Sequence, residues 1–250
     1  MPRKVSADDP TRMYKSDLLE RLTRAHPYEP LIVYIPISCG LIAYQLLWGG
    51  LFWPWVLLGL CAGLGLWSVM EYLLHRFLFH YEAKSLVGQH IMKLIHGIHH
   101  QFPNDTDRLV IPLMASVLSV ILIFGLVFGF TGGHLWWSIA LSTGILMGYI
   151  NYDYTHFATH HLTPKTPWAK AQRRRHLLHH YKYPDACFGV TTGFWDWVFR
   201  TSEANAKVAV KEGRMKAYPR EKWKVLEQQL SSKAQTTSSN QSGKPVQNAR

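Results

Sequence analysis

Two long stretches of this 250-residue chain, residues 30–70 and 109–152, contain no Asp, Glu, Lys or Arg. A helix needs roughly 20 apolar residues to cross the hydrocarbon core of a bilayer. Each stretch is therefore long enough for two helices, and Gly49-Gly50 and Gly132-Gly133 are typical of the turns between them. A soluble protein with a buried helical core is the alternative, but uncharged runs of this length would leave such helices no polar face. The sequence predicts an all-α integral membrane fold with four spans in two hairpins, near residues 31–49, 53–72, 110–130 and 135–153.

The basic residues predict the orientation of these spans. All 27 Lys and Arg residues fall in residues 1–29, 71–108 or 154–250, and none lies in the two short turns. Two membrane hairpins put these three segments on one side, which the positive-inside rule makes cytosolic. The net charge of +11 is then expected to face anionic headgroups. Nucleic-acid binding is disfavoured, because no recognised motif accompanies the charge.

The composition also predicts how the chain is organised. We expect a cytosolic N-terminal segment at 1–29, a membrane domain at 30–200 and a cytosolic C-terminal segment at 201–230. Residues 231–250 are mostly Ser, Gln, Asn, Thr and Lys, a composition typical of a disordered tail. The expected location is endoplasmic reticulum in a eukaryote or the inner membrane in a bacterium.

Fourteen histidines are many for a chain of this length, and their placement is more informative than their number. His26, His90 and His134 stand alone and are expected to be ordinary polar residues. The other eleven form four clusters in the predicted cytosolic segments or at span ends. These are His75 and His80; His96, His99 and His100; His156, His160 and His161; and His176, His179 and His180.

Helical spacing predicts that these clusters converge on metal. Residues three and four apart share a helix face, so the two His-x-x-His-His clusters should each point three imidazoles in one direction. His75 and His80 would lie some 140° apart on an ideal helix, and we expect them to bracket the site or to lie where the helix ends. Ten imidazoles are too many for one ion. We predict a dinuclear site ligated by His75, His80, His96, His99, His100, His156, His160, His176, His179 and His180.

Three further residues are expected to support this site without binding metal. His161 points roughly 100° away from His160 on an ideal helix. Asp153 and Asp196 are placed to orient imidazole N–H groups. Imidazole suits zinc, copper, iron and nickel alike, and none of the three cysteines lies in a Cys-x-x-Cys pattern. The residues themselves therefore leave the metal open.

The segments around these histidines resemble the membrane fatty acid hydroxylase superfamily, which also contains sterol desaturases and carotenoid hydroxylases. The similarity covers roughly residues 30–200 and is closest to fatty acid 2-hydroxylases. That narrower resemblance is carried by HRFLFH at 75–80, HGIHHQFPND at 96–105, RLVIP at 108–112, YDYTH at 152–156 and FGVTTGFWD at 188–196. The chain departs from the usual pattern at Leu113, where a proline is expected, and at Leu162 and Cys187, where glycines are expected.

The resemblance implies a membrane-bound hydroxylase that uses two iron ions and O2. Zinc can take the place of iron in the purified protein, since imidazole binds both. The expected reaction places a hydroxyl group on the carbon next to the carbonyl of a fatty acyl chain, free or in a sphingolipid. The acyl chain would enter from the bilayer.

A separate electron donor is a further expectation. Residues 1–29 contain no cytochrome b5 domain, and no His-Pro-Gly-Gly haem motif occurs. Electrons would then come from a carrier of the cytochrome b5 or ferredoxin type. Arg173, Arg174 and Arg175 are the candidate docking residues, with anionic lipid headgroups as the equally weighted alternative partner.

Two other functions stay open from the sequence. The first is a member of the same superfamily that acts on a sterol, a carotenoid or an alkyl chain, which would share every metal ligand. The second is a membrane metal-binding or transport protein without redox chemistry. A transporter should place polar ligands near the bilayer midplane, and the predicted spans contain none.

Overall fold

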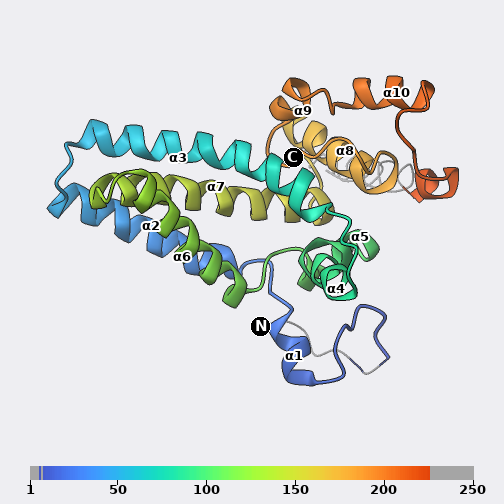
Figure 1. Cartoon of the computed structure of the whole chain (residues 1–250), viewed down its shortest axis with the longest axis horizontal. Coiled ribbons are helices and arrows are strands. Elements are labelled where there is room, and N and C mark those ends of the chain that lie inside the picture. The colour runs from blue at the N-terminus through green and yellow to red at the C-terminus, as the bar shows by residue number, and fades with distance from the viewer. Residues whose placement is uncertain (1–5, 7, 226–250) are drawn as a thin grey trace, which may run out of the picture.

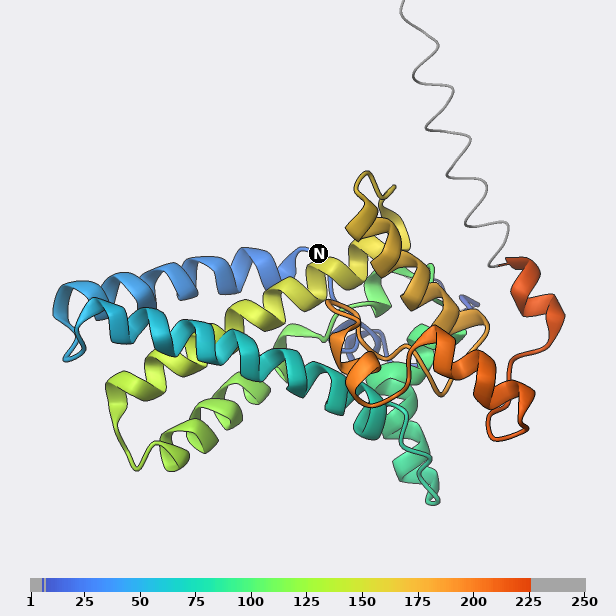
Figure 2. The same cartoon turned by 90° about the horizontal axis from the view of Figure 1, so that it is seen from above.

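The structure is a computed structural model that describes residues 6 and 8–225, so the predicted tail at 231–250 lies outside the described residues. The described chain is all-helical, as predicted. Four long helices form an elongated bundle (Figure 1): α2 (Glu29–Trp48), α3 (Trp53–Leu73), α6 (Leu113–Phe130) and α7 (Leu135–His161). The shorter helices gather at one end of this bundle (Figures 1 and 2): α1 (Asp17–Leu22), α4 (Leu86–Met92), α5 (Ile98–Gln101), α8 (Pro167–Tyr181), α9 (Phe194–Val198) and α10 (Glu203–Lys211).

Three segments in the described part of the chain are long and apolar enough to cross a membrane. They are Glu29–Trp48, Trp53–Phe79 and Thr106–Phe130, and apart from residue 49 they cover three of the four predicted spans. The chain is therefore a multi-pass membrane protein. The fourth predicted span, residues 135–153, lies within α7, and α7 is not among these candidates.

The position of α7 explains why this helix is less apolar than the others. It packs against α2, α3 and α6, and Figure 2 shows it crossing between them. Ser138 and Thr143 are fully buried on it. A helix enclosed by other helices faces protein, where small and polar side chains favour close packing.

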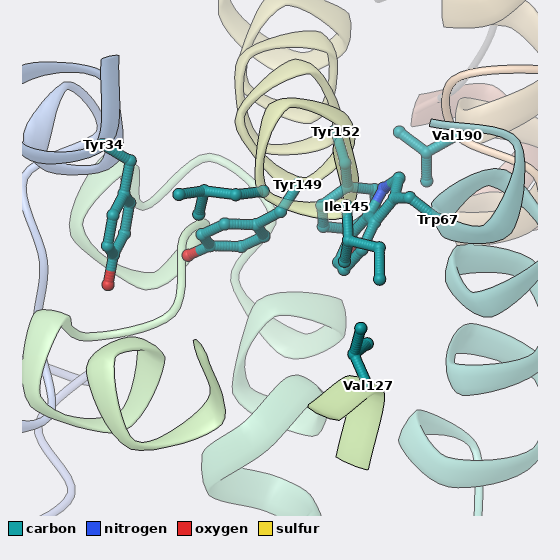
Figure 3. Close-up of a cluster of buried hydrophobic side chains, with 8 residues drawn as sticks. Tyr34, Trp67, Val127, Ile145, Tyr149, Tyr152 and Val190 are labelled. Carbon is teal, nitrogen blue, oxygen red and sulfur yellow. The ribbon is translucent and has the colours of Figure 1, made fainter. Parts of the chain in front are cut away.

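Glycines let α3 and α7 approach each other closely. A Cβ atom at Gly63 would collide with the carbonyl oxygen of Leu141, and one at Gly144 would collide with that of Leu60. The backbones therefore touch at this crossing. On the same side of α7, Tyr149 and Tyr152 pack edge-on against Trp67 (Figure 3), which fixes α7 against α3 one helical turn before the histidines begin.

The N-terminal segment folds back onto the loop that follows α5. Glu20 accepts hydrogen bonds from Arg24 at 2.7 Å and from Arg108 at 2.5 Å, and Arg24 also pairs with Asp105 at 3.1 Å. All four side chains are at most 4% exposed. The sequence predicted only a cytosolic location for the N-terminal segment. The buried network joins this segment to the loop that directly follows His96, His99 and His100.

Candidate metal centre

The structure gathers the ten predicted ligands into two groups at the end of the bundle. In each group, every histidine places one ring nitrogen within 4.8 Å of a ring nitrogen on each of the other four histidines. The first histidine group is His75, His80, His96, His100 and His179, and the second histidine group is His99, His156, His160, His176 and His180. The two groups adjoin where His100 stacks on His180, with ring centroids 4.1 Å apart.

Each of the two His-x-x-His-His clusters is divided between the groups, which corrects the expectation that all three rings point one way. His99 belongs to the second group, whereas His96 and His100, four residues apart, belong to the first. Neighbouring residues differ by about 100° around an α-helix at ~3.6 residues per turn. His99 therefore leaves the face that His96 and His100 share. The same geometry sends His179 to the first group and its cluster partners to the second.

His80 lies where the helix ends, as one of the two alternatives predicted, and a change in helix type brings its ring close to that of His75. Residues Leu74–Phe79 form a π-helical turn, η1, in which the backbone bonds join residues five apart. His75 and His80 consequently lie on one side, with ring centroids 5.2 Å apart. A second π-helical turn, η2 (Lys93–Gly97), precedes His99. Such turns are frequent at functional sites, because they alter which residues share a face.

The donor atoms suit divalent metal ions. The Nε2 atoms face one another in pairs at 2.8–3.1 Å, including His75 with His96 and His160 with His176. Burial lowers the pKa of the His80 ring to about 4 and lowers that of His99 well below its ordinary value. The rings are therefore neutral near pH 7, with a lone pair available to a metal. Ten imidazoles in two largely buried groups fit a metal ion in each group.

A loop at residues 186–191 orients two ligands of the first group. The carbonyl oxygen of Phe188 accepts a hydrogen bond from Nδ1 of His75 at 2.6 Å. The carbonyl oxygen of Ala186 accepts one from Nδ1 of His179 at 2.8 Å. Each bond places the proton on Nδ1 and leaves Nε2 free for metal.

Two buried carboxylates hold this 186–191 loop in place. Asp196 accepts from the backbone N–H groups of Phe188 and Gly189, both at 2.9 Å. Glu71 accepts from the N–H groups of Val190 and Thr191, both at 2.8 Å. The sequence suggested that Asp196 orients an imidazole N–H group. The structure corrects this, because its carboxylate accepts from backbone N–H groups instead. Glu71 was not predicted at all, although a carboxylate at the end of an uncharged stretch was a usable signal.

The second histidine group has a different environment. Its Nδ1 atoms on His99, His156, His176 and His180 have no hydrogen-bond partner among the described residues. Asp153 is fully buried beside Tyr149, and its two carboxylate oxygens form no hydrogen bond to an imidazole among the described residues. Its predicted hydrogen bond to an imidazole is therefore not formed in this structure. The rings are held instead by the packing of α5, α7 and α8.

His161 lies outside both groups. Its ring stacks on Phe157, with centroids 5.1 Å apart, and it stands 6.3 Å from the ring of His160. This position agrees with the expectation that His161 is not a metal ligand. Its contact with Phe157 contributes to packing at the end of α7.

The three consecutive arginines do not form a common docking surface, which corrects the donor-docking hypothesis. Arg173 is only 4% exposed, and its guanidinium donates to the carbonyl oxygen of Thr159 at 2.5 Å. It stabilises the C-terminal end of α7, as cations do at such ends. Arg174 is exposed but forms an ion pair with Glu203 at 2.7 Å. Arg175 is half-buried.

Known proteins are similar to this chain in sequence and in fold. The fatty acid hydroxylase family matches residues 60–201. Two dihydroceramide fatty acyl 2-hydroxylases of Arabidopsis thaliana are 36% and 32% identical to the chain; the alignments cover 76% and 79% of it and 79% and 82% of those proteins. The solved structure of full-length Scs7p, in which only the hydroxylase domain is visible, matches with a TM-score of 0.69 at 34% identity, over 75% of this chain and 70% of that one.

The family match spans most of the second apolar segment, the whole of the third, all ten clustered histidines and the 186–191 loop. The superposition on a solved hydroxylase domain shows that the likeness extends to the arrangement of the helices. The chain belongs to the fatty acid hydroxylase family.

Proposed function

We propose that this protein hydroxylates carbon 2 of a fatty acyl chain carried by a sphingolipid such as ceramide, with O2 as co-substrate. The observation that carries the proposal is an apolar cavity of about 370 Å³ between α3, α6 and α7. Phe79 and Tyr152 line the end of this cavity nearest the histidines. The Phe79 ring lies 5.2 Å from that of His96, and the Tyr152 ring lies 5.7 Å from that of His156. The cavity therefore ends one side chain away from each histidine group.

The shape and lining of the cavity suit an extended acyl chain. Its lining residues on α7 run from Ser142 to Tyr152, a length of about 15 Å at 1.5 Å per residue. On α6 they run from Ser116 to Leu126. Apolar side chains predominate along this path, so methylene groups would be buried while the reactive end lies against the histidines. Since the path runs between helices proposed to face the bilayer, a lipid can enter from the membrane.

The ten histidines would hold two metal ions, for which we propose iron on the basis of the family. The metal supplies the redox chemistry with O2, in which one oxygen atom enters the C–H bond and the other leaves as water, at the cost of an electron pair and two protons. The protein aims the acyl carbon and excludes water. It also keeps Nε2 of His75 and His179 unprotonated through the Phe188 and Ala186 carbonyl groups.

We further propose that α7 crosses the membrane as the fourth span and that the histidines face the cytosol. The distribution of Lys and Arg supports this orientation. A reporter fused at Gly132 should then read out on the opposite side from one fused at the C-terminus. Equal readout on one side would overturn the four-span topology. A separate carrier of the cytochrome b5 or ferredoxin type is our proposed electron source.

The sequence left a sterol or carotenoid substrate as an alternative. The similarity to dihydroceramide fatty acyl 2-hydroxylases favours an acyl chain over these lipids. A transporter is disfavoured because both histidine groups lie at one end of the bundle rather than at its middle (Figure 1).

Lipid analysis of a host that expresses the gene tests the reaction. We expect 2-hydroxy acyl chains in the sphingolipids of cells with the wild-type chain and none with His179→Ala. A cavity-filling Ile123→Trp variant should retain its metal and lose most of its product, because Ile123 lines the cavity. Ile121→Trp is the matched control, since Ile121 is 62% exposed on the same helix and is not a lining residue. Hydroxylated sterols without 2-hydroxy acyl chains would refute the proposal.

A further inference from the structure

We propose that α9 is a membrane-inserted anchor that couples the bilayer surface to the first histidine group. This helix follows the 186–191 loop and carries Asp196, whose carboxylate holds that loop. Neither its membrane contact nor its coupling to the metal centre follows from hydroxylase activity. The coupling alone rests on the proposed metal-binding function.

Contacts to α3 set the depth of α9. The indole N–H of Trp195 donates to the hydroxyl oxygen of Ser68 at 3.1 Å. Four residues later, Phe199 stacks on Tyr72 with ring centroids 5.1 Å apart and an interplanar angle of 12°. Both α3 residues belong to the apolar segment Trp53–Phe79. Figures 1 and 2 both show α9 beside this end of α3.

Ser68 lies within the apolar span, so α9, which contacts it, lies next to the bilayer. Ser68 lies five residues before the end of α3 at Leu73, about 7 Å inside the helix at 1.5 Å per residue. Leu64, one turn earlier on the same helix face, is 39% exposed within the candidate span. The surface of α3 that faces lipid therefore continues directly into the surface covered by α9.

The outward face of α9 has the composition of a membrane interface. Trp197 is 70% exposed and Phe194 53%. Aromatic side chains concentrate at the boundary between hydrocarbon and headgroups, where an apolar ring and a polar edge are both satisfied. Arg200 follows directly and is exposed, and a basic side chain at this depth meets anionic headgroups. An exposed aromatic cluster of this kind would be unfavourable in water.

The coupling runs through a short series of contacts. Asp196, on the inner side of α9, is fully buried and accepts from Phe188, Gly189 and the hydroxyl group of Thr201. The Phe188 carbonyl group in turn accepts from Nδ1 of His75. Withdrawal of α9 from the bilayer would displace Asp196, loosen the 186–191 loop and release the orientation of His75 and His179. In the second histidine group, the Nδ1 atoms of His99, His156, His176 and His180 form no such hydrogen bond among the described residues.

Photo-crosslinking tests the membrane contact without reference to activity. Full-length protein in phospholipid nanodiscs would carry p-benzoylphenylalanine at position 197 or, as a matched control, at position 208. Val208 is 49% exposed but lies on α10, farther from the bundle (Figure 1). We expect lipid adducts several-fold more abundant from position 197. Equal yields from the two positions would overturn the anchor.

Metal retention tests the coupling. In nanodiscs, Trp197→Asp should lose metal to a chelator several-fold faster than wild type, and the loss should be confined to part of the bound metal. Val208→Asp should retain metal as the wild type does. Trp197→Ser, which inserts no charge, serves if the Asp variant fails to fold, and it should show the same change to a smaller degree. Wild-type retention in a folded Trp197 variant would refute the coupling, whereas absence of metal from the wild type would refute the proposed function instead.

Discussion

The two histidine groups have the same number of ligands but are held in different ways. In the first group, His75 and His179 are each oriented by a backbone carbonyl of the 186–191 loop. In the second group, the Nδ1 atoms of four rings have no hydrogen-bond partner among the described residues. The first group therefore depends on a loop and its supports, whereas the second depends on helix packing. Ligands of the same chemical type can thus differ in how easily their geometry is disturbed.

Removing one ligand from each group should have the largest effect. His179→Ala takes a ring from the first group and His99→Ala one from the second. Each variant should lose hydroxylation by more than the roughly 10–100-fold typical of residues that only support a metal ligand. Elemental analysis should show less metal in both. His161→Ala is the control, because its ring lies outside both groups; an effect as large as that of His160→Ala would make His161 a ligand.

Breaking the buried N-terminal network should destabilise both groups together. Glu20→Ala leaves Arg24 and Arg108 buried without their shared carboxylate, which should cost about 3 kcal/mol of folding free energy. The affected loop follows α5, whose histidines are divided between the groups. Thermal unfolding in detergent measures the change. Asp17→Ala removes an exposed partner of Arg12 and should cost less than about 1 kcal/mol. A similar small cost for Glu20→Ala would show that the network is dispensable.

Replacing the loop supports should separate the groups. Asp196→Asn exchanges a carboxylate that accepts from Phe188, Gly189 and Thr201 for a neutral amide. We expect metal affinity of the first group to fall roughly 10–100-fold, with the second group unchanged, in a competition titration against a chelator. Asp153→Asn should change affinity little, because its carboxylate lies beside Tyr149 and forms no hydrogen bond to an imidazole among the described residues. An effect of Asp153→Asn equal to that of Asp196→Asn would show that Asp153 orients a ligand after all.

The smallest expected effect concerns the backbone of the 186–191 loop. Cys187 is fully buried and has φ 61°, a left-handed conformation that costs a residue with a side chain about 1 kcal/mol or more. Glycine, which was expected here, adopts it freely. Cys187→Gly should therefore be about 1 kcal/mol more stable than Cys187→Ala, which retains the strain. Thermal unfolding of the two variants gives the comparison. Equal stabilities would show that the backbone at residue 187 is not strained.

Much of this architecture was predictable because it depends on local properties of the chain. The uncharged stretches predicted the long helices, and the helical spacing of the histidine clusters predicted a shared site, although not which rings belong to which group. Hydropathy and helical periodicity act over a few turns, so they can be evaluated from neighbouring residues. The prediction of the ten ligands depended also on the recurrence of such clusters. The apolar character of α7 was overestimated, because its enclosure by three other helices is not a local property.

The division of the ligands between two groups was decided only by the tertiary structure. Which ring of a cluster joins which group depends on where α5, α7 and α8 meet, and the π-helical turn at 74–79 changes the relation between His75 and His80. The roles of Arg173 and the 186–191 loop were equally hidden. Every residue has a carbonyl group, so no sequence signal marks those of Ala186 and Phe188 as acceptors. The sequence by itself determined that helices and histidines would converge. How the rings of His75 and His179 are aimed was decided by contacts of Glu71 and Asp196 with the 186–191 loop. The sequence could not show these contacts, because those of Glu71 join residues more than a hundred positions apart and those of Asp196 act through the backbone.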